Sequence, residues 1–338
     1  MEIILDPAFF TSLIQVANLK SENYLDFERF LGKLKNCKLI VFCDSFENFY
    51  KKVKEDPYLE LLINNSPVEL EIHQLLLNEI KDLAFYKNGS CFKLFMLNES
   101  VEVCNTLSEQ FGYEYLSSEN LEKKWTIYNS SRDDSSRKVT ARTSLPANNR
   151  FDSWDCLDTY IHPLTNILIN DSYILNDKQN QKIRDNLLPL ILKLAQKAPK
   201  NLPLEITILS DPSPNYLDYE KIHARLSTEL DQFLGADRYK LNLIRFSTHD
   251  RFILTNYFYI TSGKGFTFFR EDKGVNYNST TTIEFYFIFS TQKKVLIFDD
   301  LMEIKEKLEI LQNSDPGTYS KIIHYFPRKE SRIFNLIS

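Results

Sequence analysis

A histidine and an arginine two residues apart are the groups of this chain that could best act on phosphate. The run Ser-Thr-His-Asp-Arg at 247–251 leads into an apolar segment that predicts a strand. Because side chains alternate between the two faces of a strand, we expect His249 and Arg251 to point to the same side. A histidine can attack phosphorus or move a proton, and a guanidinium can hold a phosphate through paired hydrogen bonds. The pair therefore predicts an anion-receiving cleft.

Other polar and basic residues surround this pair. Asn256 follows the predicted strand, and Lys264 lies in a Gly-Lys-Gly turn at 263–265. Asp171 and Tyr173 follow an earlier apolar run. The predicted phosphate-binding residues are Arg251, Lys264, Arg245 and Arg270.

Simpler interpretations of the same residues stay open. The segment 249–251 could form a surface ion-pair cluster at a strand end, in which Asp250 pairs with a nearby base. Asp171 could be a turn residue and Tyr173 an aromatic residue at a rim. Tyr257, Tyr259 and Phe266 are interleaved with the basic residues, which is the pattern of a surface that stacks bases, although aromatic residues on strands are usually core.

The motif resembles that of the phospholipase D superfamily, which has a histidine, a lysine two positions on, an aspartate and a glycine-serine turn. His249 keeps the histidine, whereas Arg251, Asn256 and Lys264 replace the lysine, the aspartate and the serine. Over about 160–300 the chain is similar to the phospholipase D-like module at the carboxy terminus of MIT-domain proteins and in several bacterial proteins linked to defence against phage. The resemblance implies a phosphodiesterase or nuclease scaffold with an altered site, in which His249, Arg251 and Asn256 hold the catalytic positions and Asp171 and Tyr173 have a secondary role. It also implies a prokaryotic anti-phage defence or nucleic-acid-processing system.

The resemblance also implies how such a site would work. One histidine attacks phosphorus and a second protonates the leaving oxygen, with no cofactor, so two copies of the motif are needed. The only other candidate, His223 followed by Arg225, lies in a predicted helix. Activity would then require a homodimer that brings two His249 side chains together. The alternatives are recognition of phosphate or nucleic acid without turnover, and a non-catalytic module that binds a protein partner of a multi-component system or a membrane phosphoinositide.

The first part of the chain has a different pattern, in which strands and helices alternate. Such an order predicts a three-layer α/β arrangement with a parallel sheet. It resembles the PIN-like nuclease fold, with Asp6 closing the first strand, Glu60 or Glu69 on the middle helices, and Asn98-Glu99 ending a later strand. The resemblance implies a divalent metal held by Asp6, Glu60 and Glu99. The alternative is that these carboxylates are solvated or cap helices.

The fold class expected for the whole chain is α/β with two domains. We predict an α/β domain at 1–125, a polar linker at 126–150, and a mixed sheet flanked by helices at 151–338. The expected strands are 2–5, 38–42, 91–96, 166–174, 204–209, 240–246 and 281–290, with a hairpin after 246. The expected helices are 9–18, 25–34, 45–54, 68–83, 101–111, 179–197, 219–234 and 301–312.

Composition limits the classes of function. The 338 residues are 43% hydrophobic with a formal charge of -5, so the chain as a whole does not attract nucleic acid or anionic membranes, and a local basic patch would be needed. With 8 glycines and no glycine-rich motif, a phosphate-binding loop of that kind is excluded. No signal peptide or transmembrane segment is expected, and the five cysteines are spaced as reduced core residues. We therefore expect a cytoplasmic protein.

Overall fold

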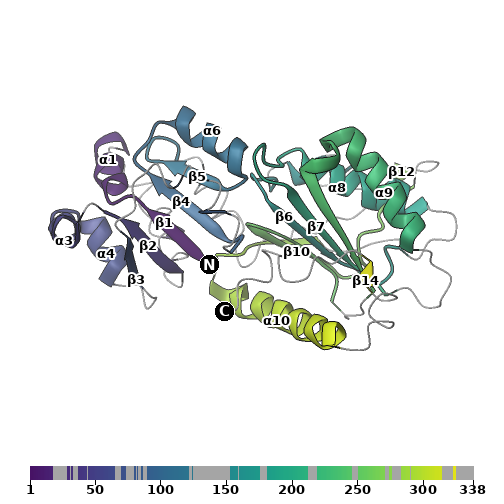
Figure 1. Cartoon of the computed structure of the whole chain (residues 1–338). Helices are drawn as coiled ribbons and strands as arrows, with labels where there is room; N and C mark the ends of the chain where they lie inside the picture. Colours follow the sequence, from purple (N-terminus) through teal and green to yellow (C-terminus); the bar gives the residue numbers. More distant parts are fainter. Residues whose placement is uncertain are drawn as a thin grey trace, which may run out of the picture.

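The structure, a computed structural model, is a mixed α/β fold with two main sheets (Figure 1). It describes residues 1–17, 29–30, 32, 37–43, 45–64, 70–73, 80, 82, 85–86, 90–121, 124, 153–158, 160–175, 181–211, 219–245, 250–270, 274–275, 283–289, 291–313 and 323–324. The strands of the first sheet lie between residues 2 and 117, and those of the second between 166 and 324. The predicted linker lies outside the described residues.

The first sheet has five parallel strands in the order β3-β2-β1-β4-β5. Its strands are β1 (Glu2–Leu5), β2 (Lys38–Phe42), β3 (Leu70–His73), β4 (Lys93–Leu97) and β5 (Glu114–Ser117). The accompanying helices are α1 (Ala8–Ala17), α3 (Phe46–Glu55), α4 (Pro57–Asn64) and α6 (Val101–Phe111). The chain adds β2 and β3 on one side of β1 and β4 and β5 on the other, so the strand order reverses between β1 and β4.

Helices cover both faces of this sheet, because successive strand residues point to opposite sides. Ile3, Val41 and Met96 pack on the face covered by α1, α3 and α4. Ile4 and Phe95 pack on the opposite face, which α6 covers with Cys104, Leu107 and Phe111. The serine before α3 and the serine before α6 each accept a backbone N–H of the first turn, and Gly112 ends α6 in the left-handed conformation at φ 70°.

The second sheet has seven strands in the order β13-β10-β9-β6-β7-β8-β14. They are β6 (Asn166–Asn170), β7 (Leu204–Leu209), β8 (Tyr239–Ile244), β9 (Phe252–Thr255), β10 (Phe258–Ser262), β13 (Ile283–Phe287) and β14 (Ile323–His324). β6, β7 and β8 are parallel, whereas β9, β10, β13 and β14 join antiparallel to their neighbours. A separate two-stranded ribbon is formed by β11 (Phe269–Arg270) and β12 (Gly274–Val275).

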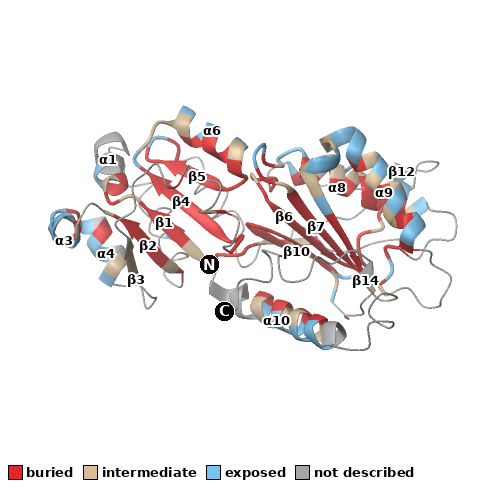
Figure 2. Cartoon of the chain, in the orientation of Figure 1, coloured by how far each residue is buried: buried red, intermediate tan, exposed pale blue. Residues whose placement is uncertain are grey.

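Helices flank the second sheet (Figure 1). They are η3 (Trp154–Leu157), the π-helical turn η4 (Ile183–Leu187), α8 (Leu188–Ala195), α9 (Tyr219–Leu234), η5 (Ala236–Arg238) and α10 (Thr291–Asn313). On α10 the buried residues Ile297, Leu301, Ile304 and Leu308 form one stripe at helical spacing. The Tyr259 hydroxyl donates to Asp300 at 2.7 Å and ties this helix to β10. Figure 2 shows the strands of both sheets buried and the outer faces of the helices exposed.

The two sheets pack against each other through a buried contact, and one hydrophobic cluster contains residues of both. The Tyr257 hydroxyl donates to the Lys93 carbonyl at 2.7 Å and accepts the Glu114 N–H at 2.6 Å. Tyr257 and Glu114 are 0% and 2% exposed. Burial of these polar groups requires that they be paired, so the contact has a defined geometry.

Many predicted elements are confirmed, with β1, β2, α6, β7 and α9 beginning and ending as expected. The helix predicted at 68–83 is wrong in part, because Leu70–His73 forms β3 and pairs with β2. Four alternating residues are too short a run to identify by periodicity, and the pairing is a long-range contact. Helix α4 is not expected from the sequence, and α10 begins ten residues before its predicted start. The helix predicted at 25–34 lies largely outside the described residues.

Two compositional expectations can be compared with the structure. Cys37, Cys91 and Cys104 are buried free thiols, and Cys43 and Cys156 are partly buried free thiols, as predicted. No helix in the described ranges combines the length and the apolar character that crossing a bilayer requires.

Candidate functional site

The ends of several strands gather at one edge of the second sheet. β6 and β8 end there because they run parallel, and the antiparallel strand β9 begins there, with Phe252 opposite Asn170. β10 ends at the same edge, because Thr261 lies opposite Phe252. We call the residues just beyond these strand ends, namely Asp171, Tyr173, Arg245, Arg251 and the turn 263–265, the Arg251 edge. The structure therefore brings the segment after β6 and the turn after β10 to the same edge as Arg251.

Arg251 is half-buried at the start of β9 and is held by two contacts. Its Nη1 donates to the Gly263 carbonyl at 3.3 Å, and its guanidinium carbon lies 5.3 Å from the centre of the Tyr173 ring. Tyr173 is 50% exposed, so it forms the rim of the edge. A guanidinium has five N–H donors, and one of them reaches the carbonyl. The other donors have no hydrogen bond to any residue that the structure describes, and they remain for an anion.

Asp171 holds the backbone of the Arg251 edge through hydrogen bonds. It is 2% exposed, and its carboxylate accepts the Phe266 N–H at 2.9 Å and the Tyr173 N–H at 3.0 Å. Gly265 has φ +81°, and a Cβ at this position would lie 2.4 Å from Asp171 Oδ2. Only glycine fits this backbone and this approach. Asp171 is therefore a turn residue and Tyr173 a rim aromatic, which is one of the interpretations that the sequence leaves open.

Asn186 fixes the segment that follows the turn. It is fully buried in η4, and its side-chain oxygen accepts the N–H groups of Phe268 at 2.6 Å and Phe269 at 2.7 Å. Its side-chain nitrogen donates to the Phe269 carbonyl at 3.0 Å. The sequence analysis misses this residue. The available signal is an asparagine beside Leu187, within the apolar stripe of the predicted helix.

The other predicted basic residues are less closely engaged. The Arg245 Nε lies 3.3 Å from Asp211 Oδ1, and both side chains are about a third exposed, at 36% and 34%. Lys264 is exposed in the turn. The backbone of Arg270 belongs to β11, while its side chain lies outside the description. His249 also lies outside the described residues, so its predicted position beside Arg251 stays a prediction.

Asn256 requires a correction, because it lies at the opposite end of β9 from Arg251. It is fully buried, and its side-chain oxygen accepts the N–H groups of Thr165 at 2.9 Å and Asn166 at 3.1 Å. Its side-chain nitrogen donates to the Cys91 carbonyl at 2.7 Å. The first two bonds join the end of β9 to the start of β6, and the third joins them to the segment that precedes β4 of the first sheet. Asn256 therefore has a structural role, and the prediction that it belongs to the Arg251 cleft is wrong.

Of the two interpretations of the interleaved aromatic residues, the core is confirmed and the base-stacking surface is wrong. Tyr257, Tyr259 and Phe266 are 0%, 2% and 0% exposed. All three side chains belong to the hydrophobic core. Tyr173 is the aromatic residue of the Arg251 edge that is available to stack on a ligand.

The carboxyl edge of the first sheet carries the residues predicted to hold metal. The Asp6 carboxylate accepts the Ala8 N–H at 2.8 Å and caps α1, while Glu60 is exposed on α4. The Ser12 hydroxyl donates to Asn98 Oδ1 at 2.5 Å, beside Glu99. Among the residues that the structure describes, no group of three His, Cys, Asp or Glu side chains is placed to hold a metal ion. Asp6, Glu60 and Glu99 are all described, so they do not form such a group.

A charged cluster that the sequence analysis misses lies where the two sheets meet. Glu114, 2% exposed, accepts from His162 Nδ1 at 2.6 Å and pairs with Lys124 Nζ at 2.7 Å. Burial alone would raise the pKa of Glu114, but His162 and Lys124 outweigh it and lower the pKa to about 2. The carboxylate is therefore ionised at neutral pH. We call these three residues the Glu114 junction.

No protein-family model and no curated protein matches the chain. Roles for the residues described above therefore rest on their geometry and on the motif in the sequence.

Proposed function

We propose that this protein binds phosphate groups, most readily those of nucleic acid, at the Arg251 edge. One observation carries the proposal: β6, β9 and β10 meet so that Arg251 lies at the sheet edge, and within the described ranges most of its donors make no hydrogen bond. A guanidinium suits a phosphate because its planar donors match two phosphate oxygens. Arg251 also lies against the exposed Tyr173 ring, which provides a surface on which a base can stack.

The topology of the second sheet supports a phospholipase D-like unit with an altered motif. The order strand, helix, strand, helix and strand, followed by an antiparallel hairpin, places the motif region at the ends of central strands. If His249 shares this edge, the unit could cleave phosphodiesters without metal, in a homodimer that supplies two histidines. An anti-phage defence or nucleic-acid-processing role, with protein partners, comes from the resemblance of the motif.

The first sheet supports the accompanying proposal of a PIN-like unit. In open α/β sheets, ligands bind beyond the carboxyl ends of the strands, where the strand order reverses. Asp6 and Asn98 follow β1 and β4, the two strands at this point. A divalent metal here would need ligands other than the set of Asp6, Glu60 and Glu99.

Binding and cleavage of labelled oligonucleotides test this function directly. We expect Arg251→Ala and Lys264→Gln to weaken binding, while Lys51→Gln on the exposed face of α3 leaves it unchanged. Equal affinity of all four proteins would contradict the proposal. Cleavage that survives EDTA and is lost in His249→Ala would assign the chemistry to the second unit. Cleavage lost in EDTA but kept in His249→Ala would assign it to the first unit.

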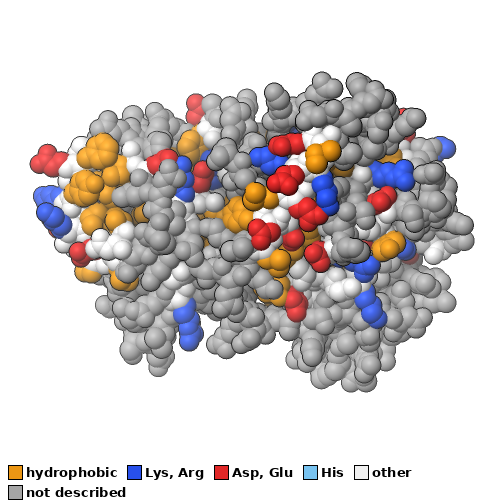
Figure 3. Space-filling view, turned by 90° about the horizontal axis from the view of Figure 1, so that it is seen from below, with side chains coloured by type: hydrophobic (Ala, Val, Ile, Leu, Met, Phe, Trp, Pro, Cys, Tyr) orange, Lys and Arg blue, Asp and Glu red, His pale blue; other side chains and the backbone are white. Residues whose placement is uncertain are grey.

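A non-catalytic function in protein binding is favoured by a separate observation. Phe46, Tyr50 and Leu61 are 52%, 55% and 38% exposed on the neighbouring helices α3 and α4. Figure 3 shows hydrophobic side chains gathered at this end of the molecule. Replacing Phe46 and Tyr50 by serine should abolish binding of a protein partner without changing nucleic-acid affinity. The rival phosphoinositide module predicts instead that vesicles containing phosphoinositide compete with oligonucleotide at the Arg251 edge.

A further inference from the structure

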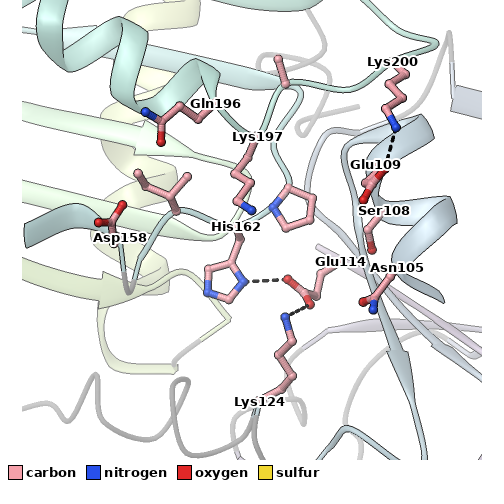
Figure 4. Close-up of a pocket in the computed structure, with 13 residues that line it drawn as sticks. Asn105, Ser108, Glu109, Glu114, Lys124, Asp158, His162, Gln196, Lys197 and Lys200 are labelled. Atoms are coloured by element: carbon pink, nitrogen blue, oxygen red, sulfur yellow. Dashed lines mark hydrogen bonds and ion pairs between the residues drawn. The ribbon is translucent and has the colours of Figure 1, made fainter. Parts of the chain in front are cut away.

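A cavity of about 610 Å³ lies beside the Glu114 junction, between α6 and the segment after α8 (Figure 4). Asn105 and Glu109 on α6 line one side, while Ile161, Pro163 and Lys197 line the other. The volume is within the range of about 300 to 1,000 Å³ that is usual for small-molecule sites. Helix α6 accompanies the first sheet and the segment after α8 accompanies the second. An occupant would therefore contact residues from both parts of the chain.

Most of the charges around this cavity are already paired. Lys200 pairs with Glu109 at 2.6 Å at the rim, and Asp158 pairs with Lys193 at 2.7 Å. Glu114 is shared between Lys124 and His162. These pairs leave no carboxylate of the wall available for a cationic ligand, which argues against a site for a cation.

Lys197 is the exception in this wall. Its side chain is exposed, and within the described part of the chain its ammonium makes neither a hydrogen bond nor an ion pair. In Figure 4 Lys197 and Lys124 extend toward the pair of His162 and Glu114 from opposite sides. Glu114 is thus one carboxylate among two lysines and a histidine. An added anionic group would find favourable charge here.

The remaining lining suits the body of an organic molecule. The side-chain amides of Asn105 and Gln196 are exposed and have no partner among the described residues, so each can donate a hydrogen bond. Ile161, Pro163 and Ala198 offer apolar surface. A few polar groups converging on a partly apolar wall is the usual composition of a small-molecule site.

We propose that this cavity binds a small organic anion. Its anionic group pairs with Lys197 and Lys124, and its body lies against Ile161 and Pro163. The His162 ring is 5% exposed, so it supports Glu114 and does not itself reach the ligand. A ligand here stabilises the packing of the two units, because it binds the folded chain and has no site in the unfolded one.

Calorimetric titration of the full chain with 5′-AMP, phenyl phosphate and benzoate tests this inference. We expect at least one of these anions to bind with a dissociation constant below about 1 mM. Adenosine and phenol, the neutral counterparts, should bind much more weakly. Preference for phosphate probes over benzoate would identify the anionic group as a phosphate, and the reverse a carboxylate.

Matched variants show which site the anion occupies. Lys197→Gln should weaken binding about tenfold, whereas Lys51→Gln should leave it unchanged. Arg251→Ala should remove only binding at the Arg251 edge and leave the binding that depends on Lys197 in place, which separates this cavity from the proposed nucleic-acid site. The inference is overturned if none of the anions binds, or if binding is lost in Arg251→Ala and kept in Lys197→Gln.

Discussion

The Arg251 edge and the Glu114 junction hold their charges in opposite ways. At the junction, a fully buried carboxylate is compensated by the ammonium of Lys124 and a hydrogen bond with His162, and the three side chains hold the two sheets together. At the edge, the half-buried Arg251 makes one bond to a carbonyl and one contact with an aromatic ring. A buried charge must be compensated by the protein itself, whereas a charge at the surface can be compensated by a ligand. The comparison therefore separates groups that stabilise the fold from groups that can bind.

The largest loss of stability is expected when Asn256, whose buried side chain also links the two parts of the chain, is replaced. Asn256→Ala leaves the N–H groups of Thr165 and Asn166 and the carbonyl of Cys91 without this partner. We expect the free energy of unfolding to fall by about 4 kcal/mol, measured by urea denaturation. Asn64→Ala, at the exposed end of α4, is the control and should change it little.

Asn256→Asp sharpens the same test, because it introduces the carboxylate that the phospholipase D motif has at the corresponding position. It places a charge in a fully buried position, so it should destabilise the fold and confer no phosphodiesterase activity. A stable Asn256→Asp protein with new cleavage activity would contradict the structural role assigned to Asn256.

A somewhat smaller loss of stability is expected from substitution of Glu114 in the Glu114 junction. The pKa of Glu114 is lowered from 4.5 to about 2, so the ionised form stabilises the fold fully above pH 4.5, and this stabilisation is lost as the pH falls through 2. Its value is about 3 kcal/mol. Glu114→Gln should therefore lower the free energy of unfolding by about this amount at pH 7. Between pH 4.5 and 2 it should lose less stability than the natural chain, and equal pH dependence would contradict this assignment.

At the Arg251 edge, the turn is the feature most sensitive to substitution. Gly265→Ala forces a Cβ to within 2.4 Å of the Asp171 carboxylate in a left-handed backbone. We expect a loss of about 2 kcal/mol in the free energy of unfolding, together with weaker oligonucleotide binding. Gly32→Ala is a matched control, since a Cβ there has no neighbour within 4 Å. Equal stability of the two variants would show that the turn is not constrained as described.

What the sequence could predict depends on how local the determinants are. α6 and α9 were predictable because capping residues and a helical stripe lie within the segment itself. The association of Asp171 with Arg251 was predicted only from the resemblance of the sequence to a phospholipase D-like module. By contrast, Glu114 and His162 are 48 residues apart and meet through the packing of two sheets, so no spacing rule indicates them.

Glu114 and His162 were missed by the sequence analysis, whereas Asn256 was assigned to the wrong site. A motif fixes the number of residues between two positions, but it does not fix where a strand ends. β9 has 4 residues, so Arg251 and Asn256 emerge at opposite edges of the sheet. The buried amide then serves the contact between the two sheets, and the basic residues remain at the other edge.

The salt dependence of oligonucleotide binding tests the central claim most directly. Each phosphate contact that is removed should lower the slope of log affinity against log salt concentration by about one. Arg251→Ala should therefore reduce both the slope and the affinity for a labelled single-stranded oligonucleotide, while Lys51→Gln should reproduce the natural chain. An unchanged slope in Arg251→Ala would show that Arg251 does not contact phosphate.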